Sequence, residues 1–457
     1  MNREALAPSA LRPARNRPPG PKGLSFWWEQ FRAPGDSLSF LQRLTRDYGD
    51  MVFLHLLTVP ACVTSDLAAI EQVLVTNSQN FTKSQDYRAL YVILGEGLLT
   101  SEGDMWKRHR KLVQPAFFRE RIASYGPLMT EAAERVASEW QHGEVRDMHR
   151  DLMRITLEIA ARSLFDIEIG GQANAIGTAL GIMMEDFMRL TSVHFFLPNW
   201  LSIVGPRRFR RALREMESIV YSIVKDKRAS GKRSNDLLSL MLEAREEDGT
   251  GLSDKELRDE VMTLLLAGHE TTANTLGFTL YLLAQNPEAE ARLCAELDEV
   301  LGGRTAQPAD LHRLPYTDMV LKESMRLYPP AWAIGRKAIG DFDLLGYQFP
   351  RGTNVFMSQW IMHRNPRYFP DPERFDPERW SEQSALHRTL PKFAYLPFGA
   401  GPRVCVGASL AITEATLVLA TLYQRYRFRL ATTEPLQVLP SVTLRPKDGI
   451  ALRVEKR

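Results

Sequence analysis

Over most of the chain, apolar residues recur every three or four positions with polar residues between them. This spacing predicts amphipathic helices, most clearly over residues 129–140, 257–285, 288–301 and 317–328. Shorter runs of apolar and β-branched residues predict strands near residues 50–57, 61–65, 342–350 and 353–359. The strands fall in one early and one late region. We therefore expect a mainly helical α+β fold with small sheets.

The longest helical pattern has clear ends. Ser253 followed by Glu256 fits a capping box, and the Asn-Pro pair at 286–287 stops the run. The helix would hold roughly thirty residues and span on the order of 45 Å, enough to cross a whole domain. Inside it, "AGHETT" at 267–272 interrupts the apolar pattern. Ala267 and Gly268 leave room for a flat body against the helix. Thr271 would turn its hydroxyl onto the helix backbone and line a groove with Glu270.

The composition along the chain predicts its domain organisation. Residues 1–22 are rich in Pro, Ala and Arg and predict a flexible tail, whereas no low-complexity linker divides residues 23–457, which we predict to be one domain. The aromatic cluster Phe26–Trp28 would either touch a membrane surface or pack as part of a first helix, and packing is favoured. The chain shows no secretory signal and no convincing membrane span.

Charge and cysteine usage exclude several classes of protein. A net charge of +3 gives no indication of nucleic-acid binding. The three cysteines lie far apart with no CxxC pair, so the sequence supports neither a zinc knuckle nor a disulfide framework. This usage suits a reducing compartment, so we predict a cytoplasmic protein.

One cysteine, Cys405, lies in an unusual loop, "FGAGPRVCVG" at 398–407. No histidine base is near it for nucleophilic catalysis. Inert packing would not require glycines that permit positive φ and close approach. A thiolate ligand to iron fits better, because backbone N–H groups of such a turn can donate to the sulfur. A helix starting near Gly407 would place its positive end beside the thiolate. A buried structural cysteine in a turn is the alternative.

The loop fits the pattern F-x-x-G-x-R-x-C-x-G at Phe398, Gly401, Arg403, Cys405 and Gly407. It resembles the haem-binding signature of the cytochrome P450 monooxygenases, and the resemblance extends over residues 23–457, toward the soluble bacterial type. It implies a triangular helical body with a long central helix over haem b, and Cys405 as the iron ligand. The other implied cofactor contacts are Arg403, Phe398, Gly399, Gly401, Gly407, Trp106, Arg110, Arg336, Ala267 and Gly268.

The same resemblance assigns roles to several polar side chains. Thr271 would hold oxygen and its waters, and Glu270 would help relay protons; the alternative is a buried helix whose polar groups are satisfied by neighbours. Trp106, Arg110, Arg336 and Arg403 would contact the haem propionates. Glu323 and Arg326, one helical turn apart, would form a buried structural cluster with Arg379 rather than a weak exposed pair.

The resemblance also implies partners. Lys107, Arg108 and Lys111 form a basic patch that would dock an acidic ferredoxin or flavodoxin, which passes electrons from NAD(P)H through a reductase; a solvated helix face is the plainer interpretation. An apolar pocket would be lined by Tyr87, Tyr91, Trp332, Val442 and Leu444, although each is equally compatible with the core. We expect a monomer.

We therefore predict a monooxygenase that hydroxylates or epoxidises an apolar molecule, with a long-chain fatty acid, a terpenoid or a polyketide as the first candidates. Three alternatives stay open. One is a haem-thiolate peroxygenase or isomerase, which would need no electron donor. Another is a haem-binding sensor or carrier without turnover, and the last is a helical protein without haem in which Cys405 is structural.

Overall fold

The computed structural model describes residues 16–21, 37–56, 59–168, 173–196, 205–231, 236–244 and 251–457. The Phe26–Trp28 cluster lies outside these ranges. The chain packs into two compact units, Met1–Ser84 with Gly335–Met357 and Gln85–Ile334 with Ser358–Arg457. The chain leaves the first unit after Ser84 and re-enters it at Gly335, far along the sequence, and one domain over residues 23–457 stays a prediction.

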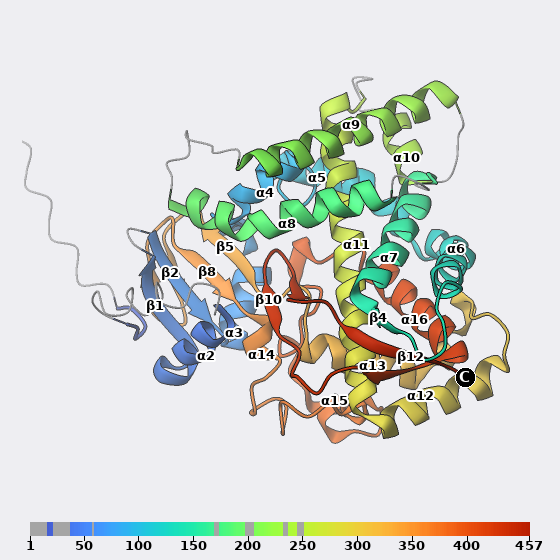
Figure 1. Ribbon diagram of the computed structural model, residues 1–457. Helices are drawn as coiled ribbons and strands as arrows, with labels where there is room; N and C mark the ends of the chain where they lie inside the picture. The colour runs from blue at the N-terminus through green and yellow to red at the C-terminus, as the bar shows by residue number, and fades with distance from the viewer. Residues whose placement is uncertain are drawn as a thin grey trace, which may run out of the picture. The chain divides into compact units, whose positions relative to one another are not determined.

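The first unit is built on a five-stranded sheet with the order β1-β2-β8-β5-β3. Its strands are β1 (Met51–Leu56), β2 (Val59–Thr64), β3 (Phe81–Lys83), β5 (Ile334–Ala338) and β8 (Asn354–Met357). β1 and β2 pair antiparallel, and β2 pairs parallel with β8. The unit also holds α2 (Ser37–Tyr48), α3 (Leu67–Glu71), and a hairpin of β6 (Phe342–Leu344) and β7 (Tyr347–Phe349). These elements confirm the strands predicted in both regions (Figure 1).

Part of the predicted flexible tail is bonded to this unit. The Phe53 backbone N–H donates to the Pro19 carbonyl oxygen at 3.0 Å, and the Gln348 N–H donates to the Asn16 carbonyl oxygen at 2.9 Å. The Arg17 guanidinium lies over the Phe53 ring, 4.6 Å from its centroid. Residues 16–21 therefore pack along the sheet unit instead of extending from it.

The second unit is mainly helical. Its helices are α4 (Tyr87–Leu94), α5 (Gly103–Val113), α6 (Arg119–Ala137), α7 (Met148–Phe165), α8 (Ala173–Phe196), α9 (Arg207–Ser230), α10 (Leu237–Glu243), α11 (Asp254–Gln285), α12 (Pro287–Leu301), α13 (Pro315–Leu327), α14 (Gln359–Met362), α15 (Ala385–Thr389) and α16 (Ala408–Arg425). A three-stranded sheet joins β4 (Val145–Asp147), β12 (Ala451–Lys456) and β9 (Tyr426–Leu430), and β10 (Val438–Pro440) pairs with β11 (Leu444–Pro446).

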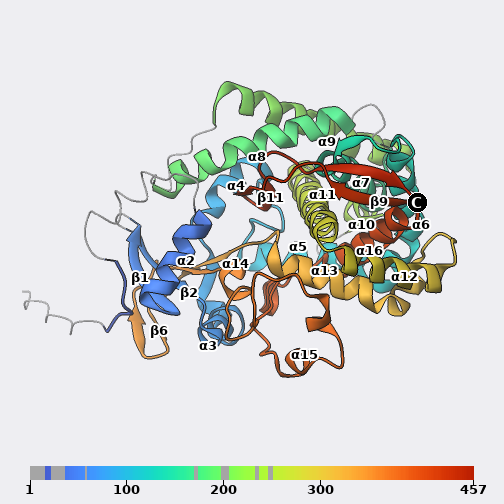
Figure 2. The ribbon, with the colours of Figure 1, turned by 60° about the horizontal axis from the view of Figure 1, so that its bottom comes forward.

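Helix α11 organises this unit. Both hydrogen bonds of the predicted capping box at Ser253 and Glu256 form, and the helix ends at Gln285, before the Asn-Pro pair. α11 runs through the unit and packs against α7, α9, α13 and α16 (Figures 1 and 2). The residues of α11 are therefore buried on nearly every side of the helix, and only a few positions along it keep exposed surface.

Among the helices in the described ranges, none is long and apolar enough to cross a membrane.

Candidate active site around Cys405

The loop that carries Cys405 is a tight turn ahead of α16. Gly399 and Gly401 adopt φ of +72° and +71°, a left-handed conformation that favours glycine. The Cys405 N–H donates to the Phe398 carbonyl oxygen at 3.0 Å and closes the turn. Gly407 has a φ of −90° and is the N-cap residue of α16. Gly407 therefore begins α16 and does not adopt the positive φ of the other two glycines.

The Cys405 thiol is exposed, yet protein surrounds it closely enough that burial raises its pKa. The Gly407 backbone N–H, which bonds to the sulfur, and the Arg110 guanidinium both lower that pKa. Cys405 is therefore an exposed residue with two groups beside its sulfur that favour the thiolate against the effect of burial. The other cysteines, Cys62 and Cys294, are buried, and burial raises their pKa to about 12 and about 11. Only Cys405 of the three offers its sulfur to a bound group.

One face of α5 contacts this loop. The Arg110 Nη1 donates to the Val404 carbonyl oxygen at 2.8 Å. Trp106, one turn earlier, lies under the Arg403 guanidinium, which is 5.3 Å from the ring centroid. Arg403 itself is paired with the Glu102 carboxylate, with one N–O distance of 2.6 Å. The structure thus brings Trp106, Arg110 and Arg403 together, but the charge of Arg403 is balanced by a residue that the sequence did not indicate.

Two of the three cations of the predicted basic patch are paired with acids. Arg108 is half-buried and forms an ion pair with Glu256. Lys107 is exposed and pairs with Asp104, one turn earlier, at 2.8 Å. Lys111 is exposed. Lys107 and Lys111 are therefore the exposed cations of the patch, and Arg108 contributes less surface.

A short face of α11 is open. From Leu257 to Leu283 every residue is buried except Ala267, Gly268 and Thr271, which lie within about one helical turn of each other. A Cβ added to Gly268 would meet nothing closer than the Ala160 Cβ, at 3.8 Å. The Thr271 hydroxyl donates to the Ala267 carbonyl oxygen at 2.7 Å, as the sequence predicted. These small residues leave a surface on which a flat group can lie.

Glu270 does not share this face, which corrects the predicted groove. Its side chain is buried. Burial raises the pKa of Glu270, while the Arg445 charge and the Thr443 hydrogen bond lower it. Successive residues of a helix point about 100° apart, which is why only Thr271 faces the open surface. The neighbouring His269 is buried, and burial lowers its pKa to about 3.

The structural cluster forms inside the helical unit. The Glu323 carboxylate accepts from Arg326 at 2.8 Å and from the Arg379 Nε at 3.2 Å. It also accepts from the Trp380 Nε1 at 3.0 Å. Arg326 and Glu323 have no exposed surface, and Arg326 donates to three backbone carbonyl groups, those of His363, Pro372 and Arg374. The cluster therefore fixes the segment 363–379.

His363 connects this cluster to the cysteine loop, and the sequence did not single it out. Its carbonyl oxygen accepts from Arg326, while its Nε2 accepts from the Leu396 backbone N–H at 3.0 Å. The Leu396 carbonyl oxygen accepts in turn from the Gly399 N–H at 3.2 Å. Burial, with Arg326 and Arg364 nearby, lowers the pKa of His363 to about 3, so it stays neutral. A second missed group is Glu414 on α16, a buried carboxyl group whose pKa burial raises strongly.

The five predicted pocket residues differ in how much exposed surface they have. The Trp332 Nε1 donates to the Ser441 carbonyl oxygen at 3.0 Å, so Trp332 and Val442 belong to adjoining segments, and both are half-buried. Leu444 has no exposed surface and belongs to the core, because an accessible cavity would leave surface on it. Tyr91 is 40% exposed, and its hydroxyl donates to the Thr100 carbonyl oxygen. Tyr87 is half-buried at the start of α4.

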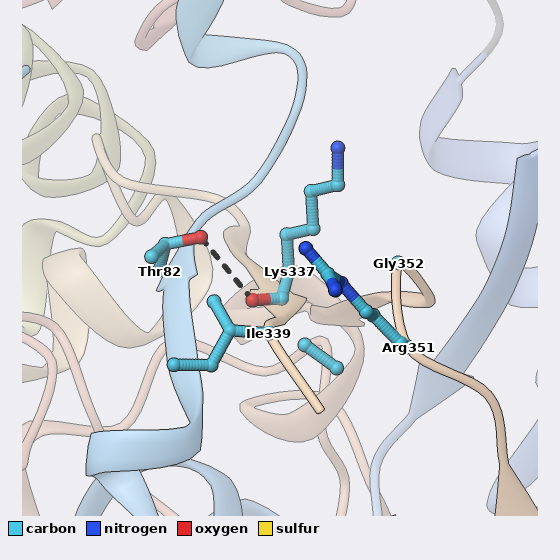
Figure 3. Close-up of a pocket in the computed structure, with 6 residues that line it drawn as sticks. Thr82, Lys337, Ile339, Arg351 and Gly352 are labelled. Carbon is cyan, nitrogen blue, oxygen red and sulfur yellow. Dashed lines mark hydrogen bonds between the residues drawn. The ribbon is translucent and has the colours of Figure 1, made fainter. Parts of the chain in front are cut away.

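Arg336 lies on β5 in the sheet unit, buried, with its Nη1 donating to the Gly335 carbonyl oxygen. A polar pocket of about 510 Å³ in the same unit contains none of the predicted site residues. Figure 3 shows it, with the Thr82 hydroxyl bonded to the Lys337 carbonyl oxygen at 3.3 Å. It is lined by Thr82, Lys337, Ala338, Ile339, Arg351 and Gly352.

The residues around Cys405 and on α11 fit a haem group. Haem presents a flat apolar ring, two carboxylates and an iron ion that takes a thiolate ligand. The helical unit supplies an accessible thiol, the half-buried cation Arg110 beside it, and the open face at Ala267, Gly268 and Thr271. α16, which begins just after Cys405, packs against α11.

Comparison with known proteins agrees with this chemistry. The sequence model of the family described as Cytochrome P450 matches residues 18–453. Cyclooctatin synthase and cyclooctat-9-en-7-ol 5-monooxygenase of Streptomyces melanosporofaciens are each 37% identical to the chain, covering 91% and 86% of it and 89% and 85% of their own lengths. Pentalenene oxygenase of Streptomyces avermitilis is 34% identical, with 89% of both chains covered. The crystal structure of the cytochrome P450DA heme domain superposes with a TM-score of 0.84 at 27% identity, covering 96% of this chain and 98% of that one.

Proposed function

The chain belongs to the cytochrome P450 family and is a P450 monooxygenase, and we propose that it hydroxylates or epoxidises a terpenoid. For a hydroxylation, the substrate RH, O2, two electrons and two protons would give ROH and water. The substrate proposal rests on the names of the three Streptomyces relatives. They refer to cyclooctatin, cyclooctat-9-en-7-ol and pentalenene, all terpenoids. Most of the proposed pocket side chains are apolar or aromatic, which suits such a molecule.

Within this proposal Cys405 holds haem b through its sulfur. Bound there, the haem supplies the activation of O2. The Gly407 N–H and the Arg110 guanidinium stabilise the thiolate, because each lowers the pKa of Cys405. Ala267 and Gly268 admit the flat ring. Arg110 is the best-placed partner for a propionate, since Arg403 would first have to leave Glu102. Trp106 lies with it on the same face of α5, and Arg336 is a further predicted partner.

Thr271 and Glu270 would have different parts in proton transfer. Thr271 faces the open surface, where its hydroxyl can orient a water molecule. Glu270 is a buried acid on the neighbouring side of the helix, and burial raises its pKa. A carboxyl group in this position can release a proton toward Thr271 and take another from water.

The substrate proposal is tested by turnover with a panel of terpenoids and long-chain fatty acids. Purified holoenzyme would be supplied with NAD(P)H, a ferredoxin reductase and a ferredoxin, and products would be identified by mass spectrometry. We expect a terpenoid product that is heavier by one oxygen atom and that depends on the electron donors. Oxidation of fatty acids alone would contradict the terpenoid assignment. Product formation with hydrogen peroxide and no electron donor would instead indicate a peroxygenase.

For the electron donor we propose a ferredoxin or flavodoxin that docks beside α5 and receives electrons from NAD(P)H through a reductase. The exposed Lys107 and Lys111 lie on the helix whose other face contacts the cysteine loop. Lys111→Glu is expected to raise the KM for the donor severalfold at low salt and less at high salt, because the attraction is screened. Lys225→Glu, a matched change on the exposed side of α9, should leave this KM unchanged. An equal KM for the wild type and Lys111→Glu would contradict docking at this helix. The cytoplasmic location rests on the cysteine usage and stays a prediction.

A further inference from the structure

Helix α9 in the helical unit has one buried face and one exposed face. It packs against α8, α10 and α11 and runs beside α8 (Figure 1). Its buried side chains recur at helical spacing and are Phe209, Ala212, Leu213, Met216, Val220 and Val224. At the start of the exposed face, four cations follow the spacing i, i+3, i+4 and i+7, which places them in one line on the helix surface. This arginine stripe consists of Arg207, Arg210, Arg211 and Arg214, all exposed.

The charges of the arginine stripe are not balanced by acids. Among the described residues, none of its four guanidinium groups forms an ion pair, and the Arg214 Nε donates to a backbone carbonyl oxygen, that of Arg210, at 3.3 Å. The charges around it are already used. Arg208, outside the stripe, pairs with the buried Asp186 at 2.8 Å, and Glu217 pairs with the buried Arg258 at 2.7 Å.

The position of the stripe works against the stability of the helix. The start of a helix carries partial positive charge and favours acidic side chains. The first turns of α6 and α7 each hold an acid, Glu120 and Asp151, whereas the first turn of α9 holds none. Like charges one turn apart within the stripe also repel each other. A sequence that breaks local rules in this way indicates a functional surface, and an anionic partner would remove both penalties.

An anionic lipid surface fits the stripe better than another macromolecule. In the sequence, α9 is preceded by a largely apolar and aromatic stretch, residues 195–204, which read FFLPNWLSIV. Apolar and aromatic residues beside cations are the combination that binds membrane interfaces, where lipid phosphates attract the cations. The proposed terpenoid substrate is apolar and dissolves in lipid. A net charge of +3 gives no comparable indication of nucleic-acid binding.

We propose that the arginine stripe of α9 docks the protein reversibly on membranes that contain anionic phospholipids. The choice of a lipid partner rests in part on the terpenoid substrate of the proposed function. The stripe covers seven residue steps of the helix, or about 10 Å, and its guanidinium groups would donate to the phosphate groups of neighbouring lipids. The attraction falls off within a Debye length, so the exposed face of α9 would lie directly against the lipid surface.

The test is cosedimentation of the haem-loaded protein with vesicles of equimolar phosphatidylcholine and phosphatidylglycerol, or of phosphatidylcholine alone. We expect binding to the anionic vesicles that weakens with salt, and little binding to the neutral ones. Arg210→Gln/Arg211→Gln should lower the partition coefficient on anionic vesicles roughly thirtyfold, because two cations are lost. Its thermal unfolding midpoint should not fall, since repulsion within the stripe is reduced.

The matched control is Arg119→Gln/Arg150→Gln. It removes two exposed arginines from the first turns of α6 and α7, has the same net charge as the stripe variant, and should bind anionic vesicles as the wild type does. An equal loss of binding in the control would show that net charge, not the stripe, causes the attraction, and would overturn the proposal.

Three further results would overturn it. They are no binding of the wild type to anionic vesicles, equal binding of the wild type and Arg210→Gln/Arg211→Gln, and tighter binding to duplex DNA than to the vesicles, which would assign the stripe to nucleic acid. Cosedimentation needs neither substrate nor electrons, so failure of the terpenoid or monooxygenase assignment would be seen separately, in turnover.

Discussion

At the scale of single residues, the site depends on neighbours in sequence that face different surroundings. Thr271 lies on the open face of α11 with its hydroxyl bonded to the Ala267 carbonyl oxygen, while Glu270 is buried toward Thr443. Cys405 is an exposed cysteine whose pKa is raised by burial of the thiol and lowered by the Gly407 N–H and the Arg110 guanidinium. In each case burial and one or two named contacts decide what the side chain can do.

Thr271→Ala is expected to keep the haem and to waste reducing equivalents. Without the hydroxyl, protons and water are no longer oriented at the open face, so product formed per NAD(P)H should fall by roughly a hundredfold or more. Peroxide released into solution should rise correspondingly. Product and peroxide would be measured together against NAD(P)H consumed, with Thr271→Ser as the control that retains the hydroxyl. Unchanged coupling in Thr271→Ala would show that this hydroxyl does not handle protons.

At the scale of elements, local patterns were predictable and distant pairings were not. The capping box of α11, the start of α16 at Gly407 and the strands of both regions follow from short stretches of sequence. The pairing of Arg403 with Glu102 joins residues 301 positions apart, and no local pattern indicates it. The separation of Glu270 from the open face, by contrast, follows from the 100° between successive helix residues and was open to prediction from the sequence.

The ion cluster at Glu323 connects two parts of the helical unit, because it joins α13 to the segment 363–379, which precedes the cysteine loop. Glu323→Gln would leave the buried Arg326 without a charged partner, which costs about 3–5 kcal/mol for a pair of this kind. We expect a lower thermal unfolding midpoint and poorer retention of haem. Glu299→Gln, at an exposed position on α12, is the control. Normal stability and haem content in Glu323→Gln would disprove the structural role.

At the scale of the whole molecule, buried histidines make stability depend on pH. Burial lowers the pKa of His363 to about 3, whereas the unfolded chain has a histidine pKa of about 6.5. The unfolded state therefore binds more protons between these values. The contribution of His363 is fully present above about pH 6.5 and declines as the pH falls toward 3, by roughly 2 kcal/mol at about pH 5.

Thermal unfolding of the wild type and His363→Gln at about pH 7 and about pH 5 tests this dependence. The variant keeps a side-chain acceptor for the Leu396 N–H and has no group that titrates in this range. We expect it to be less stable at neutral pH but to lose less stability on acidification. His312→Gln, at an exposed position, should follow the wild type. A wild-type pH dependence in His363→Gln would contradict the assignment.

Whether Cys405 ligates haem iron as a thiolate is measured by the absorption spectrum of the dithionite-reduced protein under carbon monoxide. We expect a strongly red-shifted Soret band that is lost in Cys405→Ala and kept in Cys294→Ala. A haem spectrum with an ordinary carbon monoxide band, or well-folded protein that binds no haem, would contradict it.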